Sequence, residues 1–283
     1  MITKDFDGYL ARLGITDPGA PSAEALSALQ RAHLERVPYE NVDIQLGRPP
    51  GIEPELSVRR FAAGHGGYCF HLNGGFAALL EALGYDVTRH VGGVHHDPEG
   101  RGANGNHLAL TVRVDGEAWF VDTGLGDGPY EPLPLRQGTY RQGPFTYRME
   151  ASVTEPGGWT FHNDPGSSFP VMEFAARPVT MADFAAEHVR LSTAPDSPFL
   201  STFAALRRDA KGLDLLRGRV LTRIDAAGRT ERPLDTAGEW FAVLTDVFDR
   251  NLDALDTADR TALWDRVTRA HDAWLAAQAA PQA

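Results

Sequence analysis

The chain has 283 residues and a net charge of −11, from 27 Lys and Arg against 38 Asp and Glu, which argues against wide contact with nucleic acid or anionic lipid. Its length predicts two or three structural units at about 150 residues each, and its single cysteine excludes an internal disulfide. No apolar run approaches the roughly 18 residues of a membrane span, and Lys4, Asp5, Asp7 and Arg12 oppose a secretory signal, so we expect a cytoplasmic small-molecule enzyme or protein-binding module.

The first 90 residues are expected to be mainly helical. Apolar residues spaced i, i+3, i+4 and i+7 predict a first helix that ends at Gly14. These residues are Phe6, Tyr9, Leu10 and Leu13. Ser22 predicts the cap of a second helix, and residues 37–51 are expected to form a loop rich in Pro and Gly. A third amphipathic helix is predicted to begin near Cys69 and to end at Gly84.

Strands and a mixed region are predicted after the helices. Alternating apolar residues predict strands at 86–94, 107–114 and 117–122. Pro- and Gly-rich connections are expected from there to about Pro178. The remainder combines predicted helices at 181–189 and 256–277 with a strand pair at 219–224 and 230–234, joined by a turn at 226–228. The coarse architecture is therefore a helical part, a β part and a mixed α/β part.

Cys69 lies in the segment Gly66-Gly-Tyr-Cys-Phe70, directly before the third helix. The two glycines allow a tight turn, and a helix N-terminus offers unpaired N–H groups and partial positive charge. The N–H groups and the partial positive charge stabilise a thiolate. The N–H groups can also bind the oxyanion of a tetrahedral intermediate. Two interpretations remain open: a nucleophile, or a small buried residue at the start of a core helix.

Residues 107–122 predict a hairpin that places a histidine beside an aspartate. Asp115-Gly116 is a strong two-residue turn, and the register that it sets makes His107 and Asp122 diagonal neighbours on one face, about 7–8 Å apart at the backbone. An aspartate bound to one imidazole nitrogen leaves the other free to take a thiol proton. Such a pair can also be a buried contact without a catalytic role, but a cysteine at a helix start favours a thiol enzyme.

Two other patterns carry less weight. Gly124-Leu-Gly-Asp-Gly128 follows a strand as a nucleotide loop would, but Pro129 stands where a phosphate-binding helix should begin. Close approach of this backbone to a ligand is the preferred explanation. His95-His96-Asp97 contains residue types that bind metals, but it stands in a Gly-rich stretch without a matching ligand motif, so a solvated loop is expected. No metal site is predicted.

Six segments carry a further signal, at 37–43, 66–70 with Asn73-Gly74, 107–110, 121–126, 192–199 and 252–267. In their order along the chain they resemble the arylamine N-acetyltransferase family over nearly the whole sequence. Each segment alone is a weak signal, but the ordered set is specific. The resemblance implies an α+β fold with a cysteine-protease-like catalytic core: a helical bundle at 1–90, an antiparallel β-barrel at 91–185 and an α/β lid at 186–283.

The resemblance also implies a catalytic site and a reaction. Cys69 would be the nucleophile, His107 the general base and Asp122 the residue that orients it, which are the three residues that spacing already selected. Substrate binding would fall to Tyr39, Phe70, Leu125 and Gly126, the last against the pantetheine arm of coenzyme A. Acetyl-CoA would act as co-substrate, and its acetyl group would pass through a Cys69 thioester to the nitrogen of an arylamine or hydrazine. No permanent cofactor, nucleic acid or membrane is implied.

Two positions depart from the family pattern. His65 stands where the family usually has an arginine that pairs with the acid of the early segment, so a pH-dependent pair with Glu40 is expected. His71 stands where glutamate is usual.

Other functions therefore stay open. Related proteins of the family form amides from carrier-bound thioesters without coenzyme A, and such an amide synthase is the main alternative. A transglutaminase-like cysteine amidase and a binding module with an inactive site are further alternatives. Free acetyl-CoA is the favoured donor, and positive charge for it is offered in the third part by Arg207, Arg208 and Lys211.

Overall fold

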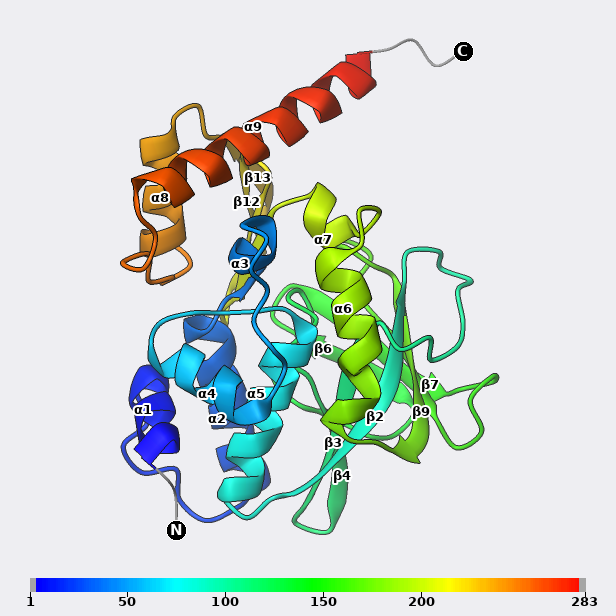
Figure 1. The fold of residues 1–283 in the computed structure, drawn as a ribbon. Coiled ribbons are helices and arrows are strands. Elements are labelled where there is room, and N and C mark those ends of the chain that lie inside the picture. The colour runs from blue at the N-terminus through cyan, green and yellow to red at the C-terminus, as the bar shows by residue number, and fades with distance from the viewer. Residues whose placement is uncertain (1–3, 280–283) are drawn as a thin grey trace.

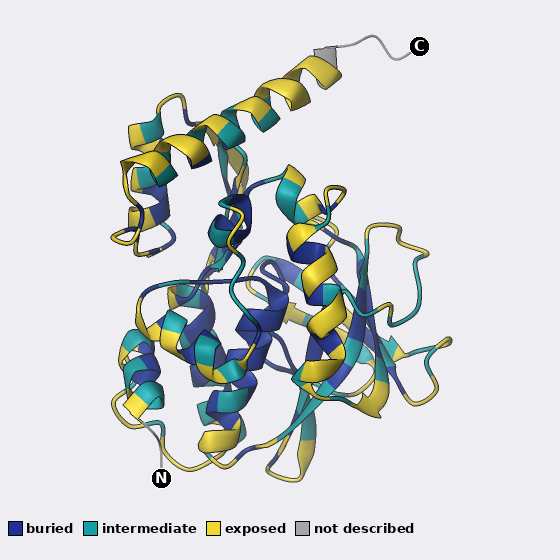
Figure 2. Ribbon diagram, in the orientation of Figure 1, coloured by how far each residue is buried: buried dark blue, intermediate teal, exposed yellow. Residues whose placement is uncertain are grey.

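The computed structural model describes residues 4–279, and its N-terminal part is a cluster of helices (Figure 1). These are α1 (Lys4–Leu13), α2 (Ala23–Arg36), α3 (Val42–Gln45), α4 (Pro54–Ala62) and α5 (Cys69–Ala82). Helix α4 packs against both α1 and α5, and α5 also packs on the neighbouring strands. Figure 2 shows that α5 is buried along most of its length, so it is the central helix of the molecule.

Local signals set the predicted helix ends. Ser22 Oγ accepts a hydrogen bond from the N–H of Ala25 at 3.1 Å at the start of α2. Gly14 and Gly84 follow α1 and α5 with φ angles of +70° and +91°, a left-handed conformation that glycine adopts without a steric penalty. The three helices expected from apolar spacing are confirmed.

The segment 37–51 is not simply a loop, as the sequence led us to expect. It contains β1 (Tyr39–Glu40) and the single turn of α3, which are too short to produce a periodic pattern. Tertiary contacts hold them instead, because the side-chain amides of Asn41 and Gln45 both donate to the carbonyl oxygen of Phe199, at 2.9 and 2.6 Å.

An eight-stranded antiparallel sheet forms the β part, in the order β5-β4-β3-β2-β9-β8-β7-β6. Its strands are β2 (Asp86–His95), β3 (His107–Val114), β4 (Glu117–Val121), β5 (Leu133–Pro134), β6 (Gly138–Gln142), β7 (Phe145–Ala151), β8 (Trp159–His162) and β9 (Val171–Pro178). The two edge strands, β5 and β6, are joined by residues 135–137 alone. This short link brings the edges together, so the sheet curls into a nearly closed barrel.

The expectation of mere connections up to Pro178 is therefore wrong, because β6 to β9 lie in this region. In β7 the side chains of Phe145, Tyr147 and Met149 alternate toward the core and are all buried. This period-2 pattern was present in the sequence, but the surrounding Gly, Pro and charged residues masked it.

The C-terminal part combines a second sheet with helices. The sheet has the order β1-β10-β11-β12-β13, with β10 (Ala204–Arg208), β11 (Gly212–Arg217), β12 (Val220–Asp225) and β13 (Gly228–Pro233). The helices are a 3₁₀ turn (Met181–Phe184), α6 (Ala185–Thr193), α7 (Pro198–Ser201), α8 (Ala237–Asp246) and α9 (Thr257–Ala279), which projects outward in Figure 1. Asp225 pairs with Gly228, so the turn is Ala226-Ala227 and the predicted turn at 226–228 is one residue too long.

The largest apolar cluster lies where α5 meets the barrel. Leu72 and Phe76 of α5 pack in one core with Leu108 and Leu110 of β3, and this contact fixes the start of α5 beside the start of β3. Strand β1 pairs with β10 across the chain, so the division into units at 1–90, 91–185 and 186–283 stays a prediction. Within residues 4–279, no helix is both long and apolar enough to span a membrane.

Candidate active site

Cys69 is the first residue of α5 and only 2% of its surface is exposed. The chain that leads to it is tightly packed: a Cβ atom at Gly66 would lie 2.1 Å from the carbonyl oxygen of Pro38, so only glycine fits there. The sulfur contacts the carbonyl oxygen of Asn106 at 3.6 Å. The first turn of a helix leaves backbone N–H groups unpaired, and Sγ therefore lies at the positive end of α5.

Strands β3 and β4 form the predicted hairpin in the predicted register. Asp115 and Gly116 have φ angles of 54° and 77°, as a two-residue type I′ turn requires. At the other end of the hairpin, His107 Nε2 lies 2.7 Å from Asp122 Oδ2. Both side chains are almost completely buried. The predicted contact between the histidine and the aspartate is confirmed.

The carboxylate of Asp122 is fully occupied by donors. Its Oδ2 atom bonds His107, while Oδ1 accepts from the backbone N–H groups of Gly124 at 2.8 Å and Leu125 at 2.9 Å. These bonds fix the carboxylate plane and the following loop together. Asp122 therefore holds His107 by Nε2, so that Nδ1 is the nitrogen left to face the thiol.

The electrostatics of His107 depend on its two neighbours. Burial by itself would lower the pKa of His107, but the negative charge of Asp122 and the hydrogen bond to it outweigh burial. With further contributions from Cys69, the pKa of His107 is raised to about 10. The imidazole therefore carries a proton at neutral pH, which places a cation beside Cys69.

Asn73 joins the three parts of the site, a role that the sequence did not reveal. One turn after Cys69 on α5, its Nδ2 donates to the carbonyl oxygen of Leu108 at 2.6 Å. Its Oδ1 accepts from the N–H and the hydroxyl of Thr123 at 2.8 and 2.9 Å. These partners are the chain neighbours of His107 and Asp122. An amide at i+4 from the cysteine, on an otherwise apolar helix, was the available signal.

Gly124 explains part of the glycine-rich stretch after β4. A Cβ atom at this position would lie 2.8 Å from Cys69 Cα and 3.0 Å from Asn73 Nδ2. The sequence favoured close approach of this backbone to a ligand. At Gly124 the close neighbour is α5 itself, so the absence of a side chain allows the Asp122 loop to touch this helix.

The residues expected to bind substrate surround this centre to different degrees. Burial, followed by the charges of Cys69 and Asp127, raises the pKa of Tyr39. A Cβ at Gly126 would lie 3.4 Å from the Tyr39 ring. Leu125 is 7% exposed, and Phe70 is fully buried. The substrate roles of Tyr39, Phe70, Leu125 and Gly126 stay predictions.

A groove of about 510 Å³ lies over the second sheet and reaches the residue after Gly126. Strands β11 to β13 and helix α9 supply most of its wall. Its lining includes Asp127, Ser168, Phe203, Arg217, His271 and Trp274. The groove thus combines aromatic, hydroxyl, cationic and carboxylate groups, the last from Asp127 and Glu231.

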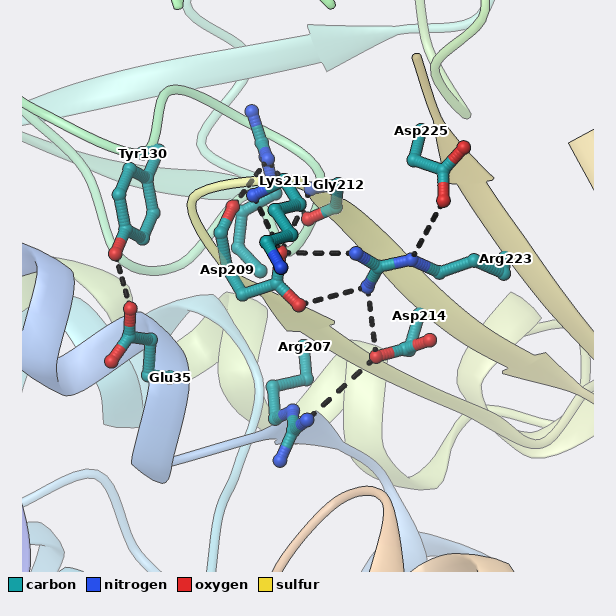
Figure 3. Close-up of polar contacts among 10 residues, drawn as sticks. Glu35, Tyr130, Arg207, Asp209, Lys211, Gly212, Asp214, Arg223 and Asp225 are labelled. Carbon is teal, nitrogen blue, oxygen red and sulfur yellow. Dashed lines mark hydrogen bonds and ion pairs between the residues drawn. The ribbon is translucent and has the colours of Figure 1, made fainter. Parts of the chain in front are cut away.

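The cations proposed from sequence to receive a donor lie elsewhere. Arg208 is 1% exposed and stacks on the Phe145 ring, 4.0 Å from its centroid. Figure 3 shows a separate cluster in which Arg207 and Arg223 face Asp214, at 3.8 and 3.1 Å. The groove is not lined by Arg207, Arg208 or Lys211. The first two are held by internal contacts, so their expected role is not supported.

The expected pair between His65 and Glu40 is also wrong. The carboxylate of Glu40 instead pairs with Arg250, whose Nε lies 2.9 Å from Glu40 Oε1. Burial, followed by the positive charges of Arg250 and Arg60, lowers the pKa of His65 to about 4. His65 is thus neutral at physiological pH, and the charge of the Glu40 pair does not depend on it.

Buried neutral histidines predict loss of stability in acid. Burial lowers the pKa of His33 and of His71 to about 3. An unfolded chain binds protons on these residues at pH values below about 6.5, but the folded chain does not until about 3. The free energy of unfolding should therefore fall with decreasing pH across this window, by up to about 1.4 kcal/mol per pH unit for each histidine.

We expect His33→Asn to reduce the stability difference between pH 7 and pH 5 by on the order of 1–2 kcal/mol, because asparagine does not titrate. Asparagine keeps a polar atom for the Tyr9 hydroxyl, which contacts His33 Nδ1. Urea unfolding at both pH values measures the effect, with His96→Asn at an exposed position as the control. An unchanged pH difference in His33→Asn would contradict the buried neutral imidazole.

A buried cysteine, histidine and aspartate that meet between a helical bundle and an antiparallel sheet are the arrangement of a thiol-dependent enzyme. Comparison with known proteins defines the family. The N-acetyltransferase family model matches residues 22–257. The chain is 30% identical over 279 residues to the arylamine N-acetyltransferase of Mycolicibacterium smegmatis, covering 90% of this chain and 94% of that relative. The chain belongs to the arylamine N-acetyltransferase family.

Two further comparisons add detail. A protein of Amycolatopsis mediterranei named proansamycin X synthase is 33% identical over 155 residues, which cover 53% of this chain and about 60% of that relative's length. The arylamine N-acetyltransferase of Mycobacterium marinum, solved in complex with CoA, superposes with a TM-score of 0.84 at 26% identity, over 94% of this chain and 99% of that one. The expected fold class, a helical bundle with an antiparallel barrel and an α/β lid, is confirmed.

Proposed function

We propose that this enzyme transfers an acetyl group from acetyl-CoA through a Cys69 thioester to the nitrogen of an arylamine or hydrazine. The observation that carries the proposal is the contact between His107 and Asp122 beside a cysteine at a helix N-terminus. Relatives named arylamine N-acetyltransferase, aligned over nearly the whole chain, support the choice of acceptor. The M. marinum neighbour solved with CoA supports the choice of donor.

In the first half of the reaction, the thiolate of Cys69 attacks the thioester carbonyl of the donor. Unpaired N–H groups in the first turn of α5 stabilise the oxyanion. The protonated His107 gives its proton to the leaving thiol of coenzyme A, so the donor C–S bond breaks as the Cys69 C–S bond forms. The products are an acetyl-enzyme, free coenzyme A and a neutral imidazole.

In the second half, the amine nitrogen attacks the acetyl-enzyme and His107 takes the proton that the nitrogen loses. Collapse of the intermediate releases the amide and returns the thiolate beside an imidazolium. Asp122 keeps Nδ1 directed at the reacting atoms throughout, through its bond to Nε2. A reactive thioester becomes a stable amide, so the sequence of steps needs no external energy source.

We further propose that the groove over the second sheet receives the donor. It reaches Asp127, the residue after Gly126, and the backbone at Gly126 lies close to the Tyr39 ring. Arg217 offers positive charge for phosphates, and Trp274 offers an aromatic face for a base. Tyr39, Phe70 and Leu125 are the proposed contacts of the acceptor, and Gly126 is the proposed contact of the pantetheine arm.

The test is the intact mass of the protein after mixing with acetyl-CoA alone. We expect one acetyl group on Cys69, and we expect a later addition of an arylamine or hydrazine to remove it. Cys69→Ala is the control and should stay unmodified. A Cys69 thiol that is not acetylated by acetyl-CoA but reacts with a simple synthetic thioester would overturn the proposal. That result would favour an amide synthase that uses carrier-bound thioesters. An acyl-enzyme burst with peptide substrates would instead indicate an amidase.

A further inference from the structure

Glu40 and Arg250 form a buried ion pair next to the loop of residues 63–68, which leads from α4 to Cys69 and is called the nucleophile loop. The two residues are 210 positions apart, and Arg250 Nε lies 2.9 Å from Glu40 Oε1. Their side chains are only 1% and 2% exposed. A carboxylate buried to this degree needs a partner, because water is not available to solvate its charge.

Glu40 connects two backbone segments. Its Oε2 atom accepts from the N–H of Val42 at 2.6 Å, and its Oε1 atom accepts from the N–H of Gly66 at 3.2 Å. The backbone N–H of Glu40 donates to the carbonyl oxygen of Gly67 at 2.8 Å. Gly66 and Gly67 are the residues that lead, through Tyr68, into Cys69. The carboxylate thus determines where the chain enters α5.

Arg250 reaches this carboxylate from the C-terminal part. It lies between α8 and α9, and a second of its three guanidinium nitrogens, Nη2, is 3.7 Å from Asp43 Oδ2. The N–H of the next residue, Asn251, donates to the carbonyl oxygen of Gly64 at 2.8 Å. A Cβ at Gly64 would lie 2.8 Å from Asn251 Cβ. The loop after α8 therefore packs directly on the loop that precedes the nucleophile.

His65 occupies the middle of this contact without neutralising Glu40. Within the described residues its Nδ1 atom is buried and has no hydrogen-bond partner. Burial and then the positive charges of Arg250 and Arg60 act on its imidazole and lower its pKa, against a smaller opposing contribution from Asp43. The nucleophile loop itself thus lacks a cation for Glu40.

We propose that Arg250 is a positioning residue for Cys69, supplying from the C-terminal part the positive charge that the nucleophile loop lacks. Through Glu40 it fixes Gly66, and through Gly66 it fixes the start of α5 relative to His107. The assignment deepens the proposed function and rests on it for the role of Cys69. Docking of the loop after α8 and the geometry of the thiol are consequently one coupled event.

The first measurement is the rate at which iodoacetamide alkylates Cys69 in the full chain, as a function of pH. Arg250→Ala should slow alkylation near neutral pH by about tenfold or more, because a displaced thiol loses its contact with the imidazolium. Acetylation by acetyl-CoA should slow by about a hundredfold, the effect of a displacement near 1 Å. Arg260→Ala is the matched control. Arg260 donates hydrogen bonds to the carbonyl oxygens of Leu252 and Leu255, in the same loop after α8, but it has no contact with Glu40. It should lower the melting temperature and leave alkylation unchanged.

The decisive variant is His65→Arg in the Arg250→Ala background. An arginine at 65 can fill the space that Arg250 leaves, so H65R/R250A should recover alkylation and acetylation to within about threefold of wild type. If Arg250→Ala does not fold, Arg250→Lys takes its place in the experiment. Lysine offers one point charge instead of a planar guanidinium, so the alkylation rate should be intermediate. Adding His65→Arg should again restore the wild-type rate.

Wild-type alkylation in a folded Arg250→Ala or Arg250→Lys protein would overturn the positioning role, as would a double variant that regains stability without regaining alkylation. If wild-type protein alkylates rapidly but never accepts acetyl from acetyl-CoA, the proposed function fails. The ratios of alkylation rates among the variants still decide the role of Arg250 in that case.

Discussion

Replacing Cys69 with Ser is expected to abolish acetyl transfer, with a loss on the order of a thousandfold or more in kcat/KM. An alcohol is a much weaker nucleophile than a thiolate, so attack on the thioester carbonyl should be slow even with His107 in place. Steady-state transfer to an arylamine and single-turnover acylation both measure the effect.

The fold should tolerate Cys69→Ser, because serine differs from cysteine by one atom and Cys69 makes only a long contact with the Asn106 carbonyl, at 3.6 Å. A melting temperature close to that of wild type would show that the loss is chemical. Retention of more than about a tenth of wild-type activity would rule out covalent catalysis by this residue.

Replacing Asp122 with Asn is expected to lower the rate of Cys69 acylation by about 10³–10⁴. Both carboxylate oxygens accept hydrogen bonds, Oδ2 from His107 and Oδ1 from the N–H groups of Gly124 and Leu125. Asparagine has one acceptor and one donor group, so its NH₂ must face either the imidazole or these two N–H groups. The charge that raises the pKa of His107 is lost in either orientation.

The pH dependence of thiol alkylation separates this effect from a general loss of structure. Loss of the Asp122 charge should let burial lower the pKa of His107, so the imidazolium should disappear at a lower pH in Asp122→Asn. Asp209→Asn is a matched control, since Asp209 also accepts from two backbone N–H groups, those of Lys211 and Gly212 at 2.7 and 2.8 Å. Wild-type acylation by Asp122→Asn in a single turnover would remove Asp122 from the mechanism.

Local sequence determined the histidine–aspartate contact. A two-residue Asp115-Gly116 turn leaves one register for the strands that it joins, and the period of two then assigns every side chain to a face. The His107 and Asp122 contact follows from sixteen residues of chain, without knowledge of the remaining fold. Capping residues determined the helices in the same way, because their hydrogen bonds lie within one turn.

The sequence was less informative where the apolar residues of an element show no regular spacing. It was also less informative where a side chain's hydrogen-bond partner lies far along the chain. Strands β6 to β9 were missed because the Gly, Pro and charged residues around them masked their apolar residues. The short α3 was missed because the carbonyl of Phe199, far along the chain, holds it. Asn73 was visible as a polar residue on an apolar helix, but its partners are on β3 and in the loop after β4.

Sequence alone placed Cys69 at a helix start and His107 beside Asp122, since these positions are specified by a helix start and a hairpin register. Tertiary structure alone decided what neutralises Glu40. From the sequence, His65 was the natural candidate because it is close in the chain, yet Arg250 holds the position from 210 residues away. A buried charge must be paired with whichever cation the completed fold brings within a few ångströms, and sequence distance carries no information about that proximity.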